Sequence, residues 1–361
     1  MTRTVSDLIR ALDALAPFSS CMEWDNVGLL IGDEDAPLTG VLVTLDVTPE
    51  AVAQAKRVGA SLILSHHPVI FNPLKRLPAN SIPALCLREG IAVVSAHTNY
   101  DFAPGGVNFA LARALDLQEI VPFGPEDREK PYLSVVVFVP SAHIEPVYEA
   151  MSAAGAGRLG DYASCGFFGT GEGRFLPLEG AHPFLGAVGT PEKADEIRLE
   201  MLCAPQALPA VLAAMKSAHP YEEPAYSILP NHALHQQSVY GMLGQLPHAV
   251  SCRELALAAE AALHTHVCFS PVERPIQTVA VCGGAGSDFM REAATAGADA
   301  FLTGEVKHHE WFMAKELSLC LLAGGHHATE NIAMPQLAEQ VKAAFPELLV
   351  SLFDSDPILW A

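Results

Sequence analysis

The chain has 361 residues, half of them hydrophobic, so it is long enough for two or three domains that each bury a core. Its 41 acidic and 21 basic residues give a formal net charge of −20, which would repel DNA or RNA phosphates over most of the surface. Nucleic acid is therefore not expected as a partner.

The sequence also disfavours a membrane protein and a secreted protein. No apolar run reaches the roughly 18 residues of a membrane span, and the N-terminus has no secretory pattern, so we expect a cytoplasmic protein without membrane contact. The eight cysteines form no Cys-x-x-Cys pair and are expected to be buried thiols in a reducing compartment.

The first 115 residues alternate helices with apolar strands. Thr48 suits an N-cap, Pro49 the first helical position and Gly59 the stop of one of these helices. Continuous apolar strands between helices predict a mainly parallel sheet covered by helices. The expected elements are helix 5–15, a strand that ends at residue 32, strand 41–45, helix 49–58, strand 62–64, helix 83–89, strand 91–94 and helix 107–115.

The pattern changes between about residues 131 and 230. Two strand–helix–strand units in this stretch predict a compact ferredoxin-like α+β domain. Because the earlier pattern then resumes, we expect this domain, residues 128–234, to be inserted in a core formed by residues 1–127 and 235–361. The expected elements are strand 132–139, helix 144–154, a glycine- and aromatic-rich stretch 161–170, strand 197–203, helix 208–218 and a short segment 226–228.

The last part of the chain again predicts an α/β arrangement. Strand 278–281 leads into the glycine-rich stretch 283–286, which matches neither G-x-G-x-x-G nor a P-loop and is better interpreted as a tight turn. The remaining elements are helix 289–296, strand 298–302, a helix that begins near residue 308 and strand 319–322.

Histidines follow several of these strands. His66 and His67 come directly after strand 62–64, where the turn at Pro68 lets both rings lean into the crevice at a strand's carboxyl end. A histidine pair alone equally fits a loop with one buried and one solvated ring.

A second group supports a metal site. His326 and Glu330 lie four residues apart at the start of a helix and so share one face, although Glu330 can also serve the helix's amino end. Together with His66, His67 and Asp101, they give three imidazoles and two carboxylates at strand ends. This set suits two divalent ions such as zinc, iron or manganese, with a carboxylate between them.

Such a site favours hydrolytic chemistry. Two dications would outweigh the charges of Asp101 and Glu330, so the site would attract phosphate and lower the pKa of water. A metal-dependent hydrolase acting on a nucleotide-like substrate is one hypothesis, and a non-catalytic regulator or metal handler is the other. The absence of a Gly-x-Ser-x-Gly elbow counts against covalent hydrolysis. No residues for an organic cofactor are predicted.

Other histidines have open roles. His97, four residues before Asp101, is expected to act in acid/base catalysis or to orient a ligand rather than to bind metal itself. His308 and His309 either line the crevice or are ordinary first-turn helix residues. The segment 219–224, His-Pro-Tyr-Glu-Glu-Pro, is a structural turn, a lip over the site or a contact between subunits.

Five motifs in a fixed order make the chain resemble the family of GTP cyclohydrolase 1 type 2 homologues, the dinuclear-metal-centre hexameric proteins. The resemblance covers nearly the whole chain. The motifs are Trp24-Asp25-Asn26-Val27-Gly28-Leu29, Ser65-His66-His67-Pro68, His97-Thr98-Asn99-Tyr100-Asp101, Thr303-Gly304-Glu305-Val306-Lys307-His308-His309 and Gly325-His326-His327-Ala328-Thr329-Glu330.

The resemblance implies further properties. It implies a toroidal homohexamer with metal sites that face an internal cavity, a PII-like or CutA-like middle domain, and an activity that opens a guanine nucleotide's imidazole ring. Asn26 is a candidate for lining the site, as is His327, which stands where the family often has Tyr; Glu305 stands where it often has Asp. The metal ligands implied are His66, His67, Asp101, His326 and Glu330.

Overall fold

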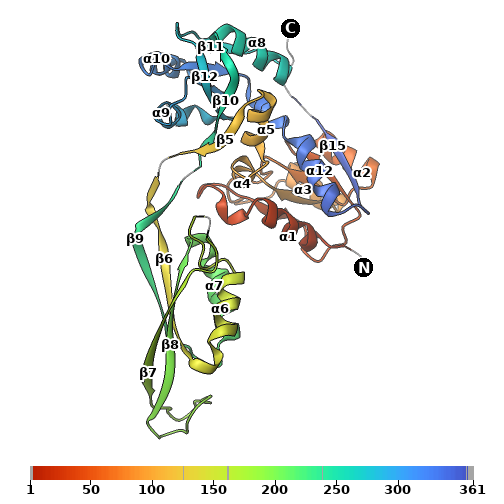
Figure 1. Ribbon diagram of the computed structural model, residues 1–361. Helices are drawn as coiled ribbons and strands as arrows, with labels where there is room; N and C mark the ends of the chain where they lie inside the picture. The colour runs from red at the N-terminus through yellow and green to blue at the C-terminus, as the bar shows by residue number, and fades with distance from the viewer. Residues whose placement is uncertain (1–2, 125, 161, 238, 355, 357–361) are drawn as a thin grey trace. The chain divides into compact units, whose positions relative to one another are not determined.

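The computed structural model describes residues 3–124, 126–160, 162–237, 239–354 and 356 (Figure 1). The chain forms two compact units. One spans Glu126–Ser238, and the other combines the segments before and after it. None of the helices among the described residues is long and apolar enough to cross a membrane.

The unit formed by the two outer segments contains a five-stranded sheet of order β1-β4-β3-β2-β15. Its four adjacent strands β4, β3, β2 and β15 run parallel, and β1 is antiparallel to β4. The strands are β1 (Gly28–Ile31), β2 (Gly40–Thr44), β3 (Leu62–Ser65), β4 (Ala92–Ser95) and β15 (Leu349–Phe353).

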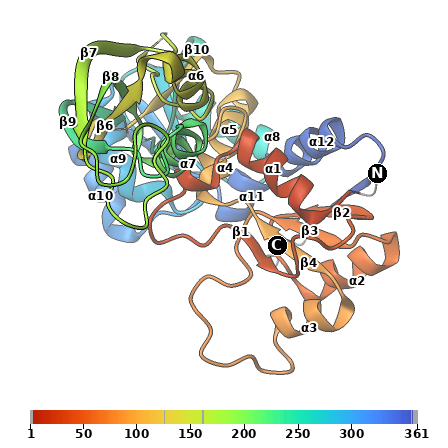
Figure 2. The same cartoon turned by 90° about the horizontal axis from the view of Figure 1, so that it is seen from below.

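Helices cover both faces of this sheet, which is why its strands are continuously apolar. Leu62 and Leu64 point into a core shared with α1 (Val5–Leu15) and α12 (Met334–Ala344), whereas Ile63 points into a core with α2 (Pro49–Val58) and α3 (Ile82–Glu89). Figure 2 shows α2 and α3 on the side opposite α1.

Capping at α2 follows the sequence prediction. The Thr48 hydroxyl accepts a hydrogen bond from the Ala51 N–H at 3.1 Å, Pro49 opens the helix, and Gly59 ends it with a left-handed φ of 74°.

The second sheet of this unit has the order β11-β14-β13-β12-β10-β5. Its three central strands β12, β13 and β14 are parallel, and antiparallel strands flank them. The elements are β5 (Gln118–Phe123), β10 (Gly241–Val250), β11 (Cys268–Ser270), β12 (Ile276–Cys282), β13 (Ala300–Thr303), β14 (Cys320–Ala323), α8 (Cys252–Leu263), α9 (Met290–Thr295) and α10 (His308–Glu316).

The antiparallel strands were not predicted. Pro122 lies in β5 and Pro247 in β10, and a proline within an apolar run argues against a strand. The cysteine expectation also needs correction, because Cys268 in β11 is exposed while five of the eight cysteines are buried. The side chains of β11, an edge strand, are exposed or half-buried.

Two segments join the sheets into one unit. In α5 (Val107–Ala114), Val107 packs in the core of the first sheet and Leu111 in that of the second. After the second sheet, α11 (His326–Asn331) leads into α12 and β15, which pairs with β2 beside the N-terminal elements (Figure 1). Residues distant in sequence therefore meet here.

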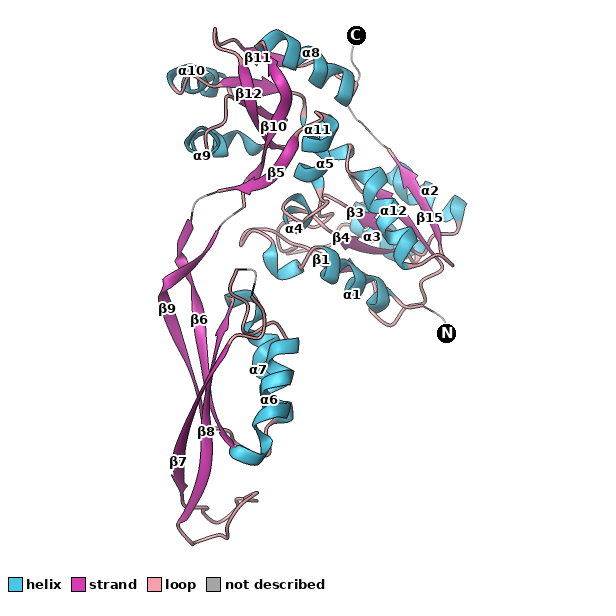
Figure 3. Ribbon diagram, in the orientation of Figure 1, coloured by secondary structure: helices cyan, strands magenta, loops and turns pink. Residues whose placement is uncertain are grey.

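The inserted unit has a β–α–β–β–α–β order and an antiparallel sheet of order β7-β8-β6-β9, with α6 and α7 on one face (Figure 3). Val137, Leu199 and Met151 are among its buried core residues. This ferredoxin-like arrangement confirms the predicted fold class. Its elements are β6 (Glu126–Pro140), α6 (Ile144–Ala153), β7 (Gly166–Phe175), β8 (Glu192–Cys203), α7 (Leu208–Ala218) and β9 (Tyr226–Gln237).

Short helices complete the described structure. They are α4 (Thr98–Asp101) and the 3-10 helices η1 (Phe18–Ser20), η2 (Ser141–His143), η3 (Pro205–Ala207) and η4 (Gly286–Phe289). Asp101, which the sequence predicted in a loop, thus ends a single helical turn.

The turn between α4 and α5 gives a prediction about stability. A methyl group at Gly106 would collide with the backbone carbonyl oxygen of Tyr100. We expect Gly106→Ala to lower the free energy of unfolding by about 1–3 kcal/mol, because backbone must move to make room. Denaturation followed by circular dichroism measures this.

Gly171→Ala is the control, because a methyl group there meets no atom within 4 Å. Equal losses in the two variants would show that the close approach at Gly106 is not the cause.

Candidate metal centre

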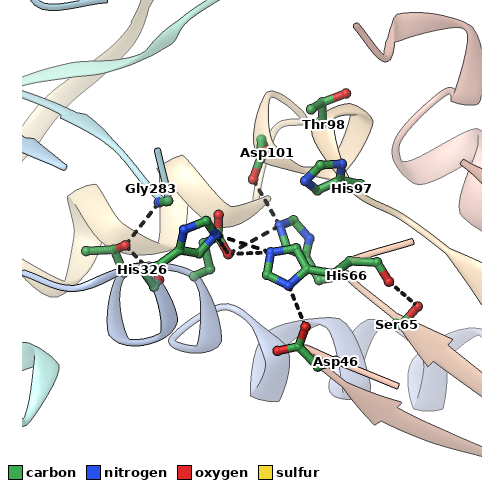
Figure 4. A network of polar contacts seen from close by, with 12 residues as sticks. Asp46, Ser65, His66, His97, Thr98, Asp101, Gly283 and His326 are labelled. Carbon is green, nitrogen blue, oxygen red and sulfur yellow. Dashed lines mark hydrogen bonds and ion pairs between the residues drawn. The ribbon is translucent and has the colours of Figure 1, made fainter. Parts of the chain in front are cut away.

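His66 begins the site directly after β3. Its side chain is fully buried, and its Nδ1–H donates to the Ala96 carbonyl oxygen at 2.9 Å, which leaves Nε2 as an acceptor. That Nε2 lies 3.4 Å from Oδ1 of Asp101 (Figure 4). Neither atom has a hydrogen-bond partner although both are buried. A cation between them would satisfy both atoms.

His67 faces the same crevice. Its Nδ1 is 2.8 Å from Oδ1 of Asp46, which follows β2, and its Nε2 is 2.9 Å from Oε2 of Glu330. The ring centroids of His66 and His67 are 5.2 Å apart. The two adjacent imidazoles therefore share one crevice, as the turn after β3 allows.

His326 and Glu330 come from α11, on one face of the helix as predicted. His326 Nδ1 is 2.9 Å from Oε1 of Glu305, and its Nε2 is 3.1 Å from Oε2 of Glu330. The Nε2 atoms of His326 and His67 are 3.3 Å apart, a distance at which one ring nitrogen can donate its proton to the other.

Glu330 belongs to two groups of potential ligands. His66, Asp101 and Glu330 form one group, and His67, His326 and Glu330 form the other, with the ligand atoms of each group within 4.8 Å of one another. Imidazole nitrogens and carboxylate oxygens are donors that zinc, iron and manganese accept. The residues present therefore fit a metal ion.

Charge at the site is balanced by these contacts. Complete burial lowers the pKa of His66 to about 3, so this ring is neutral. Burial disfavours charge on His67 too, but its carboxylate partners Asp46 and Glu330 raise its pKa to about 10. Burial opposes ionisation of Glu330, yet contacts with His326 and His67 lower its pKa. Burial and the nearby Glu330 raise the pKa of Asp101.

His97 lies beside the cluster. Its ring centroid is 5.1 Å from that of His66 and 5.5 Å from that of His67, and the three residues form a third group of potential ligands. Its Nδ1 is 2.8 Å from Oδ1 of Asp25. Asp25 is held by Thr98 as well, and despite burial these contacts lower its pKa to about 2.

The other predicted lining residues belong to none of the ligand groups found among the described residues. His308 and His309 are exposed on the first turn of α10. His327 Nε2 is 2.8 Å from Oδ1 of Asp354. The Asn26 side-chain amide donates to the Ile70 carbonyl oxygen, so it anchors the loop after His67.

The glycine-rich loop after β12 forms a wall of the site. A methyl group at Gly284 would collide with Oε1 of Glu330 and lie 3.2 Å from Nε2 of His326. The Gly284 N–H donates to Thr329 Oγ1 at 3.1 Å. The tight turn predicted from the sequence therefore also needs glycine because the ligands pass so close to it.

A family model described as Duf34/NIF3 (NGG1p interacting factor 3) matches residues 3–357. The chain belongs to this family.

Relatives agree with this assignment. The GTP cyclohydrolase 1 type 2 homolog of Bacillus subtilis is 37% identical over 327 residues, which cover 89% of this chain and 87% of that protein. The one from Mycobacterium tuberculosis is 35% identical over 356 residues, or 96% and 93% of the two chains. The resemblance drawn from the sequence motifs is confirmed.

Solved structures support the fold. A Bacillus cereus protein related to NIF3 aligns with a TM-score of 0.80 at 33% identity, and the alignment covers 100% of both chains. A Staphylococcus aureus protein aligns with a TM-score of 0.75 at 28% identity, over 100% of this chain and 99% of the other.

Sequence reasoning did not assign a role to three groups of this Duf34/NIF3 protein. These groups are Asp46, which contacts Nδ1 of His67, Glu305, which contacts Nδ1 of His326, and the Ala96 carbonyl, which contacts Nδ1 of His66. Each contact turns the Nε2 atom of its ring toward the cluster. Asp46 and Glu305 each come two positions after the last residue of a parallel strand, β2 and β13 respectively. A search for polar residues just after each parallel strand would have found both.

Metal binding to this Duf34/NIF3 protein should release protons. Because the pKa of His67 is about 10, its ring is protonated in metal-free protein at pH 8, and metal can bind only after that proton leaves. We expect zinc binding at pH 8 to release about one proton or more per chain, and affinity to fall as pH decreases. Calorimetry in buffers of different ionisation enthalpy measures the release.

Asp46→Asn should reduce this proton release, because it removes a carboxylate that raises the pKa of His67. Asp354→Asn is the matched control, since Asp354 contacts His327 outside the ligand groups. Equal release in the wild type and Asp46→Asn would contradict this account.

Proposed function

We propose that this chain binds two divalent metal ions and is a metal-dependent hydrolase acting on a nucleotide-like substrate. One observation carries the proposal. Oε2 of Glu330 lies 2.9 Å from Nε2 of His67, 3.1 Å from that of His326 and 3.9 Å from that of His66. A single carboxylate within reach of both ligand groups is the arrangement expected of a bridging ligand.

The proposed ligands are taken from the two groups that share Glu330. His66 and Asp101 would hold one ion, His67 and His326 the other, and Glu330 both. Bound divalent ions supply Lewis acidity that lowers the pKa of water toward neutrality and stabilises negative charge on a substrate. The positive charge also accounts for how an acidic chain can attract a phosphate-bearing ligand.

His97 is the candidate acid or base. The Asp25 carboxylate accepts its Nδ1–H at 2.8 Å, which leaves Nε2 free to accept or donate a proton at substrate. Asp25 stays ionised because its pKa is about 2, so it can stabilise a charged His97 ring. In this pair His97 would act as the base and Asp25 would orient its ring, as the third group does in a catalytic triad.

Exposed aromatic rings favour a nucleotide over a simple phosphoester. Trp24 is 58% exposed and Phe71 45% exposed, and their ring centroids are 5.7 Å apart. The Trp24 ring meets His97 edge-on at 6.0 Å. A planar base can stack on such a surface while its phosphates reach the metals. The name of the Bacillus subtilis relative suggests GTP as the first substrate to test.

The domain roles and assembly belong to the same proposal. Residues 1–127 and 235–361 would form the metal-binding core, and residues 128–234 a PII-like domain that senses a ligand. A toroidal homohexamer, which the family resemblance implies, and a cytoplasmic location are part of the proposal. If no substrate turns over, the same architecture would serve a non-catalytic regulator or metal handler.

Metal content tests the ligand assignment. We expect untagged protein dialysed with zinc to hold two ions per chain by elemental analysis, His66→Ala and His326→Ala to hold about one each, and Glu330→Gln to lose at least one. His309→Ala, which removes an exposed histidine outside the ligand groups, should keep both. Two ions retained by Glu330→Gln would refute the bridging role.

Turnover tests the enzyme hypothesis. With metal restored, we expect hydrolysis of GTP that chelation abolishes, and Trp24→Ala should raise KM for GTP about tenfold, because stacking contributes about 1–3 kcal/mol per base. Inhibition by tripolyphosphate, which has no base, should not change, and Trp24→Phe should behave as the wild type. Protein that holds two ions but turns over neither GTP nor a phosphodiester would refute the hydrolase proposal.

A further inference from the structure

The inserted unit contains a cavity of its own. Its volume is about 260 Å³. It is lined by β7, β8, the loop between them and the segment after α7, all within the inserted unit and separate from the ligand groups of the metal centre. The segment after α7 contains the His-Pro-Tyr-Glu-Glu-Pro motif, for which the metal centre gives no role.

One part of the cavity is aromatic. Phe175 and Phe184 each lie near Tyr221, with ring centroids 6.0 and 6.2 Å away. Leu176 and Pro183 from the loop add aliphatic surface. These side chains can surround an apolar or aromatic body of a ligand.

Another part is acidic. Glu196, Glu222 and Glu223 line the cavity, against one basic residue, Arg174. The Arg174 guanidinium is 2.6 Å from Oε1 of Glu172, which is not part of the lining and is also 3.6 Å from Nζ of Lys193. The three lining carboxylates outnumber this one guanidinium. The cavity is therefore an environment for a cation and repels phosphates and carboxylates.

The Glu196 carboxylate is held in a fixed position. Its Oε1 accepts a hydrogen bond from the Tyr221 hydroxyl at 2.9 Å. A methyl group at Gly173 would collide with this carboxylate, so glycine allows it to lie against β7. Glu196 is thus oriented before any ligand binds, which reduces the entropic cost of binding.

The motif itself is pinned by His219. Its Nδ1 accepts the Tyr221 N–H at 3.1 Å, so Nε2 carries the proton and donates to the Phe138 carbonyl oxygen at 2.9 Å. The loop over the cavity is tied to the motif by the His182 N–H, which donates to Oε1 of Glu222 at 2.9 Å. The loop between β7 and β8 and the segment after α7 are therefore held in place before a ligand binds.

We propose that this cavity binds a small organic cation, an amine with an apolar or aromatic body. The ammonium group would lie against Glu196 and its neighbouring carboxylates, and the body would lie against Phe175, Phe184 and Tyr221, where ring faces also attract positive charge. The volume lies just below the roughly 300–1,000 Å³ of drug-sized sites, which limits the ligand to about ten non-hydrogen atoms. A bare divalent metal is disfavoured, because the groups of three potential metal ligands found among the described residues all lie in the other unit.

The test compares three probes with nearly the same body and different charge, added to the full-length protein. We expect calorimetry or ligand-observed NMR to detect saturable binding of 2-phenylethylammonium at one site per chain. The neutral 2-phenylethanol should bind at least tenfold more weakly, and 3-phenylpropanoate should not bind. Equal affinity for the amine and the alcohol, or no binding of the amine, would overturn the proposal.

Variants locate the site. Glu196→Gln should weaken binding of the amine at least tenfold and leave binding of the alcohol unchanged. Glu223→Gln should also weaken binding of the amine, and because Glu223 is exposed the substitution should not disturb the fold. Glu149→Gln removes one charge from the exposed face of α6, outside the lining, and should bind the amine as the wild type does. Amine binding unchanged in both Glu196→Gln and Glu223→Gln would place the amine elsewhere and refute the assignment.

Discussion

The Glu330 carboxylate is the constraint on which the arrangement of the candidate metal centre depends. A buried carboxylate costs several kcal/mol unless positive charge or hydrogen bonds compensate it. Here compensation comes from His67 and His326, whose rings point at one of its oxygens. Those rings are in turn held from behind by Asp46 and Glu305. The negative Glu330 is thus contacted by imidazole rings, and these rings are contacted by further carboxylates. A metal ion would take the place of the protons between the rings and Glu330.

Local sequence features were sufficient to predict which histidines gather in the candidate ligand groups. His66 and His67 follow a continuous apolar strand, and His326 and Glu330 are four residues apart on a helix, so position and spacing reveal them without knowledge of the whole fold. Asp46 could not be assigned in this way, because its role depends on which ring the parallel neighbour β3 delivers to it. Contacts set by long-range topology leave no local signature.

The same distinction holds for the fold. The buried parallel strands were predicted because both their faces are apolar, whereas β5 and β10 carry prolines and were missed. Gly284 was predicted to lie in a turn, but its close approach to Glu330 depends on α11 packing against that turn. In the inserted unit, the predicted glycine- and aromatic-rich stretch 161–170 overlaps β7 only in part, because the glycines in Gly166–Phe175 hide the alternation of its side chains.

The pairing of β15 with β2 has a consequence for synthesis of the chain. The edge of β2, residues 40–44, stays unpaired until its partner strand, residues 349–353, has been synthesised. Every strand of the inserted unit lies between Glu126 and Gln237, so that unit can complete its own sheet first. Until that pairing forms, the open edge of β2 is a place where the nascent chain can aggregate, which is the kind of hazard that chaperones counter.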